Sequence, residues 1–154
     1  MSYHKPVLLN ESVHGLKINP KGVYVDATFG GGGHSKLILR KLKKGKLFAF
    51  DHDKDTKKNL LKDDGFKLTQ ANFRYIKNFL KLEGVTQIDG LLADLGVSSY
   101  QFDVAQRGFS IRYDSELDMR MNTNISVSAK DIINEYDIEI LANMFYKYGD
   151  LRNS

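Results

Sequence analysis

The sequence contains no cysteine, so it can form neither a disulfide bond nor a thiolate metal site. Its N-terminal stretch, MSYHKPVLLNES, has no apolar run long enough for a signal peptide or a membrane span. Neither sign of charge dominates, since the net charge is +4 and the isoelectric point is near 9.1. This balance permits a polyanionic partner such as nucleic acid without requiring one. We therefore expect a cytoplasmic protein that does not contact a membrane.

The fold class predicted from the sequence is α/β. A length of 154 residues and a hydrophobic content of 42% suit a globular domain with a core. In the first part of the chain, short apolar runs alternate with charged stretches of helical period, which is typical of βα units around a parallel sheet. Strands are predicted at 23–28, 46–50, 66–70 and 88–93, and helices from the glycine run to about 42, at 53–62 and at 74–83.

The chain changes character after the fourth predicted strand. Residues 100–127 are polar and rich in turn-forming residues, without a clear period, so no regular element is predicted there. Ser128 and Asp131 have the spacing of a capping box at the start of a helix. Asp137 can begin a second helix, and Gly149 can end it.

A run of glycines at 30–33 separates the first predicted strand from the following helix. Glycines let the backbone approach a ligand closely, and the free N–H groups at a helix start favour an anionic group. Open parallel sheets bind ligands beyond the carboxyl ends of their strands, which is where this run lies. The run therefore favours a ligand site, although four glycines can also form a tight turn and nothing more.

Three side chains near the ends of later strands fit the same site. Asp51 ends the second strand 21 positions after Gly30, close to the spacing of about 20 at which a carboxylate reaches a ribose. The neighbouring Asp53 is better explained as a helix cap. Phe73 is placed to flank an adenine, with a core position as the alternative. Asp94 ends an apolar strand, where a carboxylate is costly unless it meets a partner, a ligand or water.

The glycine run does not complete the fingerprint of a dinucleotide site. That fingerprint, G-x-G-x-x-G/A, requires glycine or alanine where the two possible registers place Ser35 and Lys36. A pyrophosphate cofactor is thus disfavoured. S-adenosyl-L-methionine also has a ribose and an adenine, but it carries a carboxylate, an amine and a sulfonium in place of phosphates.

Five longer motifs make the interpretation more specific. In this order they resemble the bacterial 16S ribosomal RNA cytosine-N4 methyltransferase family, also called MraW. The resemblance runs from HKPVLLNE at 4–11 to FYKYGD at 145–150. The motifs are VYVDATFGGGGHS (23–35), LFAFDHD (47–53), DGLLADLGVSSYQFD (89–103), RGFS (107–110) and LDMRMN (117–122).

The resemblance implies a Rossmann-like class I methyltransferase that uses S-adenosyl-L-methionine to methylate N4 of a cytidine in 16S rRNA of the small ribosomal subunit. It implies a cofactor-binding domain at 1–110, the start of a helical insert at 111–154, and no metal. Asp94 is the candidate catalytic residue, although the two prolines and the aromatic residue that follow this position in many amino-methyltransferases are absent. Matched position by position, the cofactor contacts are Gly32, Gly33, His34, Asp51, Phe73, Asp94 and Gln101.

Several side chains could contact RNA, each with a structural alternative of at least similar weight. The lysines between 41 and 62 are better explained as a solvated face than as an RNA contact. The candidates for base stacking are Tyr100, Phe102 and Phe109, with core or turn packing as the alternative. The candidates for holding phosphates are Arg107, Arg112 and Arg120, with surface charge as the alternative.

The family's chains continue beyond a point like Asp150, so we expect an incomplete sheet here. Its fourth strand, at 88–93, would present an unpaired apolar edge, which a longer chain or self-association would cover. Two other functions stay open. One is a non-catalytic cofactor-binding or RNA-binding fragment, and the other is a nucleotide-dependent oxidoreductase.

Overall fold

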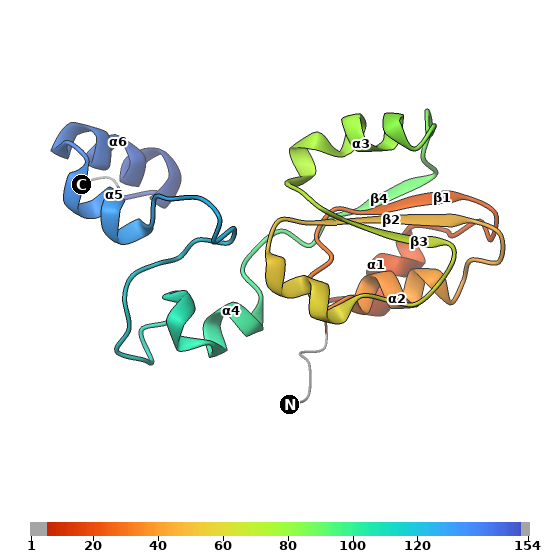
Figure 1. Ribbon diagram of the computed structural model, residues 1–154, viewed down its shortest axis with the longest axis horizontal. Coiled ribbons are helices and arrows are strands. Elements are labelled where there is room, and N and C mark those ends of the chain that lie inside the picture. The colour runs from red at the N-terminus through yellow and green to blue at the C-terminus, as the bar shows by residue number, and fades with distance from the viewer. Residues whose placement is uncertain (1–5, 152–154) are drawn as a thin grey trace. The chain divides into compact units, whose positions relative to one another are not determined.

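A four-stranded parallel sheet forms the centre of the first part of the molecule (Figure 1). The computed structural model describes residues 6–151. The strand order is β3-β2-β1-β4. Because neighbouring strands all run in the same direction, their carboxyl ends lie at one edge of the sheet. The strands are β1 (Val23–Asp26), β2 (Lys46–Asp51), β3 (Phe66–Gln70) and β4 (Gly90–Leu92). The predicted α/β class is confirmed.

Helices cover both faces of the sheet. Helices α1 (Leu9–Gly15) and α2 (Gly33–Leu39) lie on one face, and α3 (Ile76–Leu82) lies on the other (Figure 1). Successive strand residues point to opposite faces, so each strand contributes to two cores. The core on the α1 and α2 side contains Val13, Tyr24, Ile38, Leu47 and Leu92. The core on the α3 side contains Val25, Phe48, Phe50 and Leu80.

The predicted strands agree with the structure to within a few residues. The third matches exactly, and the second extends one residue further, to Asp51. The first and fourth are shorter than predicted, although Ala27 N–H still donates to Leu92 O (2.8 Å) beyond the ladder. Strand pairing therefore fades gradually where the chain leaves the sheet.

The lysine-rich helix predicted at 53–62 is wrong in type and length. The structure has a 3₁₀ helix, η1, at Lys54–Asn59. Its sequence, KDTKKN, has no apolar stripe that could pack an α-helix onto the sheet, so only tight turns form. Asp53 caps η1 as predicted, since its carboxylate accepts a hydrogen bond from Asp55 N–H (3.0 Å).

Three other helices differ from the prediction. Helix α1 was not predicted at all. Helix α2 ends at Leu39 rather than near 42, and the helix predicted at 74–83 begins as a 3₁₀ turn, η2 (Phe73–Tyr75), before α3. None of the helices among residues 6–151 is long and apolar enough to cross a membrane.

A second compact unit begins at Ser99. It contains α4 (Ser99–Asp103), a 3₁₀ turn η3 (Ala105–Arg107), α5 (Ala129–Glu135) and α6 (Ile138–Gly149). The prediction that residues 100–127 contain no regular element is therefore wrong for α4 and η3, which are too short to show a period.

The predicted start of α5 is confirmed. Ser128 and Asp131 form both hydrogen bonds of a capping box. Asp137 precedes α6 as predicted, but its side chain makes no capping hydrogen bond. Helix α6 ends at Gly149, and the next residue, Asp150, takes the left-handed conformation with φ of 54°.

Candidate functional site

The glycine run forms a tight turn between β1 and α2. Gly30 and Gly32 have φ of +50° and +75°, in the left-handed region that favours glycine. Gly32 N–H donates to Phe29 O (2.7 Å) and closes the turn. A Cβ on Gly32 would lie 3.0 Å from two atoms of the Phe29 ring, so a side chain there would displace that ring.

Asp51 lies directly against this turn. Its Oδ2 accepts a hydrogen bond from Gly30 N–H (2.8 Å), and its Oδ1 accepts one from Asp53 N–H (2.9 Å). Asn59 Nδ2 donates to Gly30 O (3.0 Å), so the N–H and the carbonyl oxygen of Gly30 are both hydrogen-bonded. Each carboxylate oxygen of Asp51 keeps a second lone pair that a hydroxyl group can use. Burial raises the pKa of Asp51, while the two N–H donors oppose that shift.

Asp26 is a buried carboxylate that the sequence-based site did not include. Its Oδ2 accepts from Ser35 Oγ (2.7 Å) and its Oδ1 from Thr28 N–H (3.1 Å), which ties the start of α2 to the end of β1. Thr28 Oγ1 in turn accepts from Asp94 N–H (2.7 Å). Burial raises the pKa of Asp26, against the lowering effect of both hydrogen bonds. The signal was present, because Asp26 lies within the apolar strand predicted at 23–28, where a carboxylate is costly unless it meets a partner.

Replacing Asp26 by alanine is expected to lower the free energy of unfolding by about 2–4 kcal/mol, since the Ser35 hydroxyl and Thr28 N–H would lose a buried acceptor. Denaturant unfolding measures this loss. Asp26→Asn keeps an acceptor and should lose less.

The pH dependence of stability gives a second measurement on Asp26. Because its pKa is raised in the folded chain, the free energy of unfolding falls as the pH rises through that pKa. Asp26→Asn, which does not ionise, should remove this dependence. Equal stability of Asp26→Ala and the parent would contradict the assignment.

The structure brings most of the predicted site residues to one edge of the sheet. Gly32, Gly33 and His34 form the turn and the start of α2, and Asp51 contacts the turn through Gly30. Asp94 is joined to the same region through its backbone. Its side chain is exposed, so the predicted cost of burying a carboxylate does not arise there.

The two remaining predicted residues lie further along the chain. Phe73 opens η2 and is 46% exposed, which argues against the alternative of a core position. Just before it, Asn72 Nδ2 lies 3.5 Å from His52 Nδ1, beside the end of β2. Gln101 is buried on α4, in the second unit. The contact of Gln101 with a cofactor stays a prediction from the resemblance.

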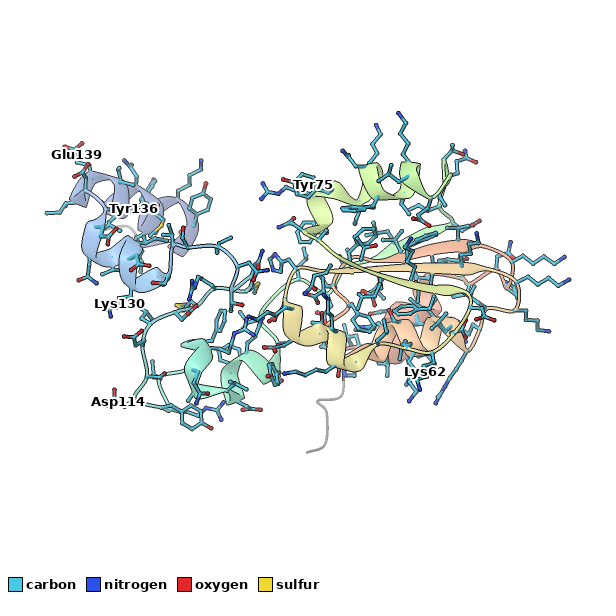
Figure 2. All side chains as sticks on the ribbon, in the orientation of Figure 1. Lys62, Tyr75, Asp114, Lys130, Tyr136 and Glu139 are labelled. Carbon is cyan, nitrogen blue, oxygen red and sulfur yellow. The ribbon has the colours of Figure 1, made fainter. Side chains whose placement is uncertain are left out.

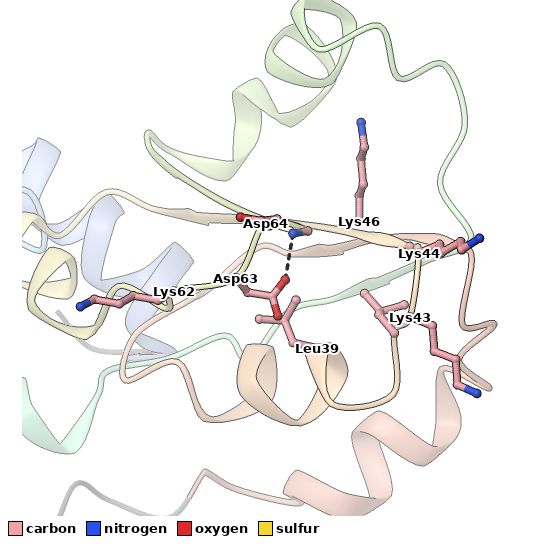
Figure 3. Close-up of a pocket in the computed structure, with 10 residues that line it drawn as sticks. Leu39, Lys43, Lys44, Lys46, Lys62, Asp63 and Asp64 are labelled. Atoms are coloured by element: carbon pink, nitrogen blue, oxygen red, sulfur yellow. Dashed lines mark hydrogen bonds between the residues drawn. The ribbon is translucent and has the colours of Figure 1, made fainter.

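A hollow of about 740 Å³ lies at the opposite end of the strands, where β2 and β3 begin (Figure 3). Its lysine side chains point in different directions, and Lys62 extends outward from the fold (Figure 2). Asp63 accepts from Gly65 N–H (2.8 Å), so this carboxylate stabilises its own turn. The polar groups do not converge, and the glycine turn is the better candidate for a cofactor site. The lysines are Lys43, Lys44, Lys46 and Lys62.

Two of the three arginines proposed to hold phosphates, Arg107 and Arg120, are engaged within the second unit. Arg107 is buried, and its Nη2 donates to the carbonyl oxygens of Arg120 (2.9 Å) and Met121 (3.2 Å). Arg120 forms an ion pair with Asp118 (2.6 Å), and this contact lowers the pKa of that carboxyl. The LDMRMN motif is thus held together by these contacts, and a structural role explains both arginines better than RNA binding. Among the described residues, no cluster of His, Asp and Glu could hold a metal ion.

Comparison with known proteins decides the family, because the family described as "MraW methylase family" matches residues 1–154. The chain belongs to the MraW methylase family. It is 56% identical, over 99% of its length, to the Ribosomal RNA small subunit methyltransferase H of Phocaeicola vulgatus, of which it covers 50%. It is 58% identical, again over 99% of its length, to the protein of that name from Cytophaga hutchinsonii, of which it covers 52%.

A third MraW relative agrees with these two. Ribosomal RNA small subunit methyltransferase H of Flavobacterium johnsoniae is 56% identical over 100% of this chain, which covers 51% of that protein. The chain therefore spans about half the length of the curated relatives it matches. The resemblance drawn from the five sequence motifs is confirmed, and so is the Rossmann-like methyltransferase class of the fold.

Proposed function

We propose that this chain is the S-adenosyl-L-methionine-binding part of a methyltransferase that modifies N4 of a cytidine in 16S rRNA of the small ribosomal subunit. The observation that carries the proposal is the contact between Asp51 and the glycine turn. This contact puts a half-buried carboxylate, whose oxygens each keep a lone pair, beside the glycine backbone of residues 30–33. The name that these relatives share, Ribosomal RNA small subunit methyltransferase H, supports the RNA substrate. Such a function implies the cytoplasm as the compartment.

The residues of the turn fit the proposed cofactor. Asp51 would accept hydrogen bonds from the two ribose hydroxyls, using the lone pairs that Gly30 and Asp53 leave free. Gly32 and Gly33 are the turn residues we assign to the methionine part, and Phe73, which is partly exposed, would flank the adenine. When bound, S-adenosyl-L-methionine supplies an activated methyl group on its sulfonium.

Asp94 is the residue we assign to the acceptor side of the reaction. Methylation of an exocyclic amine releases a proton, and the amine must be held in line with the methyl group. Asp94 has an exposed carboxylate at the carboxyl end of β4, and its backbone is fixed to Thr28 beside the turn. It can therefore accept a hydrogen bond from the amine or receive its proton. Most of the rate enhancement would come from positioning the amine.

The base must leave its stack before it can react, which costs a few kcal/mol that stacking and hydrogen bonds repay. Tyr100, Phe102 and Phe109 are the aromatic residues we propose for that role. In this proposal the cofactor-binding domain is 1–110 and the start of the helical insert is 111–154. The boundary between the two compact units falls earlier in the chain, between Ser98 and Ser99.

A second candidate function is that of a fragment that binds the cofactor or RNA without catalysis. The observation compatible with it is the contact of Asp51 with the glycine turn, which serves cofactor binding whether or not methyl transfer follows. A nucleotide-dependent oxidoreductase is disfavoured, because Ser35 and Lys36 stand where a pyrophosphate turn needs glycine or alanine.

Isothermal titration distinguishes the cofactor classes. The 154-residue chain is expected to bind S-adenosylhomocysteine at least about tenfold more tightly than NAD, because the turn lacks the glycine pattern that a pyrophosphate needs. Equal or tighter binding of NAD would overturn the choice of cofactor. Binding of neither ligand would overturn the cofactor site itself.

A further inference from the structure

A short segment ahead of α1, Pro6–Leu8, lies against the glycine turn. The Pro6 ring packs on Gly33, where an added Cβ would lie 3.0 Å from Pro6 Cδ and closer still to Cγ. His34 Nε2 lies 3.2 Å from Val7 O. Because a carbonyl oxygen only accepts hydrogen bonds, Nε2 carries the hydrogen in this contact.

The segment is also held at its other end. Leu8 has φ of 46°, an uncommon value for a residue with a side chain, and it precedes α1. Ser12 N–H donates to Leu8 O (2.8 Å), and Val13 of α1 is buried in the core shared with α2. The chain thus reverses sharply between a helix that is fixed in the core and the contacts on the turn.

The contacts that hold the segment come from the backbone and the proline ring. The side chains of Val7 and Leu8 are 58% and 63% exposed, so they contribute little to the attachment. The His34 side chain, by contrast, is only 5% exposed. Its Nε2 is used by Val7 O, so this atom binds the segment rather than a cofactor.

We propose that Pro6–Leu8 is a strap that sets the position of the glycine turn, and that His34 is the positioning residue that couples the strap to the cofactor site. This inference rests on the function proposed above. Asp26 and Asp51 hold the turn from the sheet side, and the strap holds it at Gly33 and His34. Glycine backbone loses much conformational freedom when it is ordered, so a turn held in place beforehand binds a ligand more tightly.

Titration of variants with S-adenosylhomocysteine tests the strap. His34→Leu removes the donor at similar volume, and Pro6→Gly loosens the strap without changing His34. Each should weaken binding by about tenfold, as expected for one hydrogen bond or one ordering contact. His34→Gln places an amide donor at similar reach and should recover most of the affinity. His14→Leu is the matched control, because it makes the same substitution at an exposed histidine in the last turn of α1.

The double variant distinguishes the strap from a direct contact between His34 and the cofactor, because a direct contact would make the two losses of affinity add. If both residues act through the strap, Pro6→Gly with His34→Leu should lose no more affinity than either single change. Additive losses would overturn the proposal, and so would full affinity in Pro6→Gly or no recovery in His34→Gln. Should His34→Leu fail to fold, Pro6→Gly and His34→Gln still decide the outcome.

Amide hydrogen exchange without ligand separates this proposal from the proposed function. The Gly32 amide donates to Phe29 O within the turn, so its exchange reports on the order of the turn. We expect faster exchange in His34→Leu and Pro6→Gly, with unchanged exchange in the β2 strand. Unchanged exchange at the turn would refute the strap. Failure of the parent chain to bind S-adenosylhomocysteine would refute the proposed function, while the exchange result would still test the strap.

Discussion

A chain extended by the remaining half of the family's length is expected to methylate small ribosomal subunits at least about 100-fold faster than residues 1–154, because a displacement of about 1 Å in a reactant can lose that factor. The chain spans about half of its curated relatives, and the proposed proton acceptor Asp94 follows the edge strand of the sheet. We expect the extension to hold the RNA substrate so that its amine lies in line with the methyl group.

The structure gives the physical reason for this expectation. Within residues 6–151, β4 pairs with β1 on one side and with no strand on the other. Apolar side chains near that edge are exposed, among them Leu91 at 46% and Leu95 at 70%. Proteins rarely leave such an edge uncovered. A further strand paired with β4 would cover it.

Methyl transfer onto small subunits, measured with both chains at saturating cofactor, tests the expectation. S-adenosylhomocysteine affinity is the control, since both chains contain the glycine turn and should bind it with similar strength. Sedimentation at several protein concentrations tests self-association through the β4 edge. Equal turnover by the two chains would mean that residues 1–154 already form a complete active site.

Asp51→Ala is expected to weaken S-adenosyl-L-methionine binding by about 2–3 kcal/mol, or roughly 30-fold to 150-fold, as for the loss of charge-assisted hydrogen bonds. The variant removes the ribose acceptor and also the acceptor for Gly30 N–H. Asp63→Ala is a matched control, because Asp63 also accepts from an N–H group two residues later but lies at the opposite end of the strands. Equal affinity of Asp51→Ala and the parent would refute the ribose assignment.

The pH dependence of binding provides a second measurement on the same carboxylate. Burial raises the pKa of Asp51, and the ionised form is the one that accepts hydrogen bonds from hydroxyl groups. Affinity is therefore present above the raised pKa and is lost as the pH falls through it, at a higher pH than for an ordinary carboxylate. Asp51→Asn should bind more weakly and with a flatter profile. A flat profile in the parent would contradict this role.

The sequence predicted the elements whose patterns are local. The exact match of β3 and the capping box of Ser128 and Asp131 depend on residues only a few positions apart. The placement of Asp51 beside Gly30 was also predictable, because parallel strands bring their carboxyl ends to one edge. The motifs were sufficient to identify the family, which the comparisons confirm.

The elements that the sequence did not predict depend on contacts made elsewhere in the fold. Helix α1 is short and is stabilised by burying Val13 against α2, which no local pattern reveals. The stretch 54–59 has helix-forming residues, but it has no apolar side to pack, so tight 3₁₀ turns replace the α-helix.

By itself, the sequence determined the α/β class, the order of the strands along the chain, the glycine turn and the family. Only the tertiary structure decided how that turn is held. The sheet register brings Asp51 within 2.8 Å of Gly30, the burial of Asp26 joins β1 to Ser35, and the reversal at Leu8 brings Val7 to His34. These partners are 9 to 27 positions apart in the chain, so the packing of α1, α2 and the sheet determines which polar groups meet.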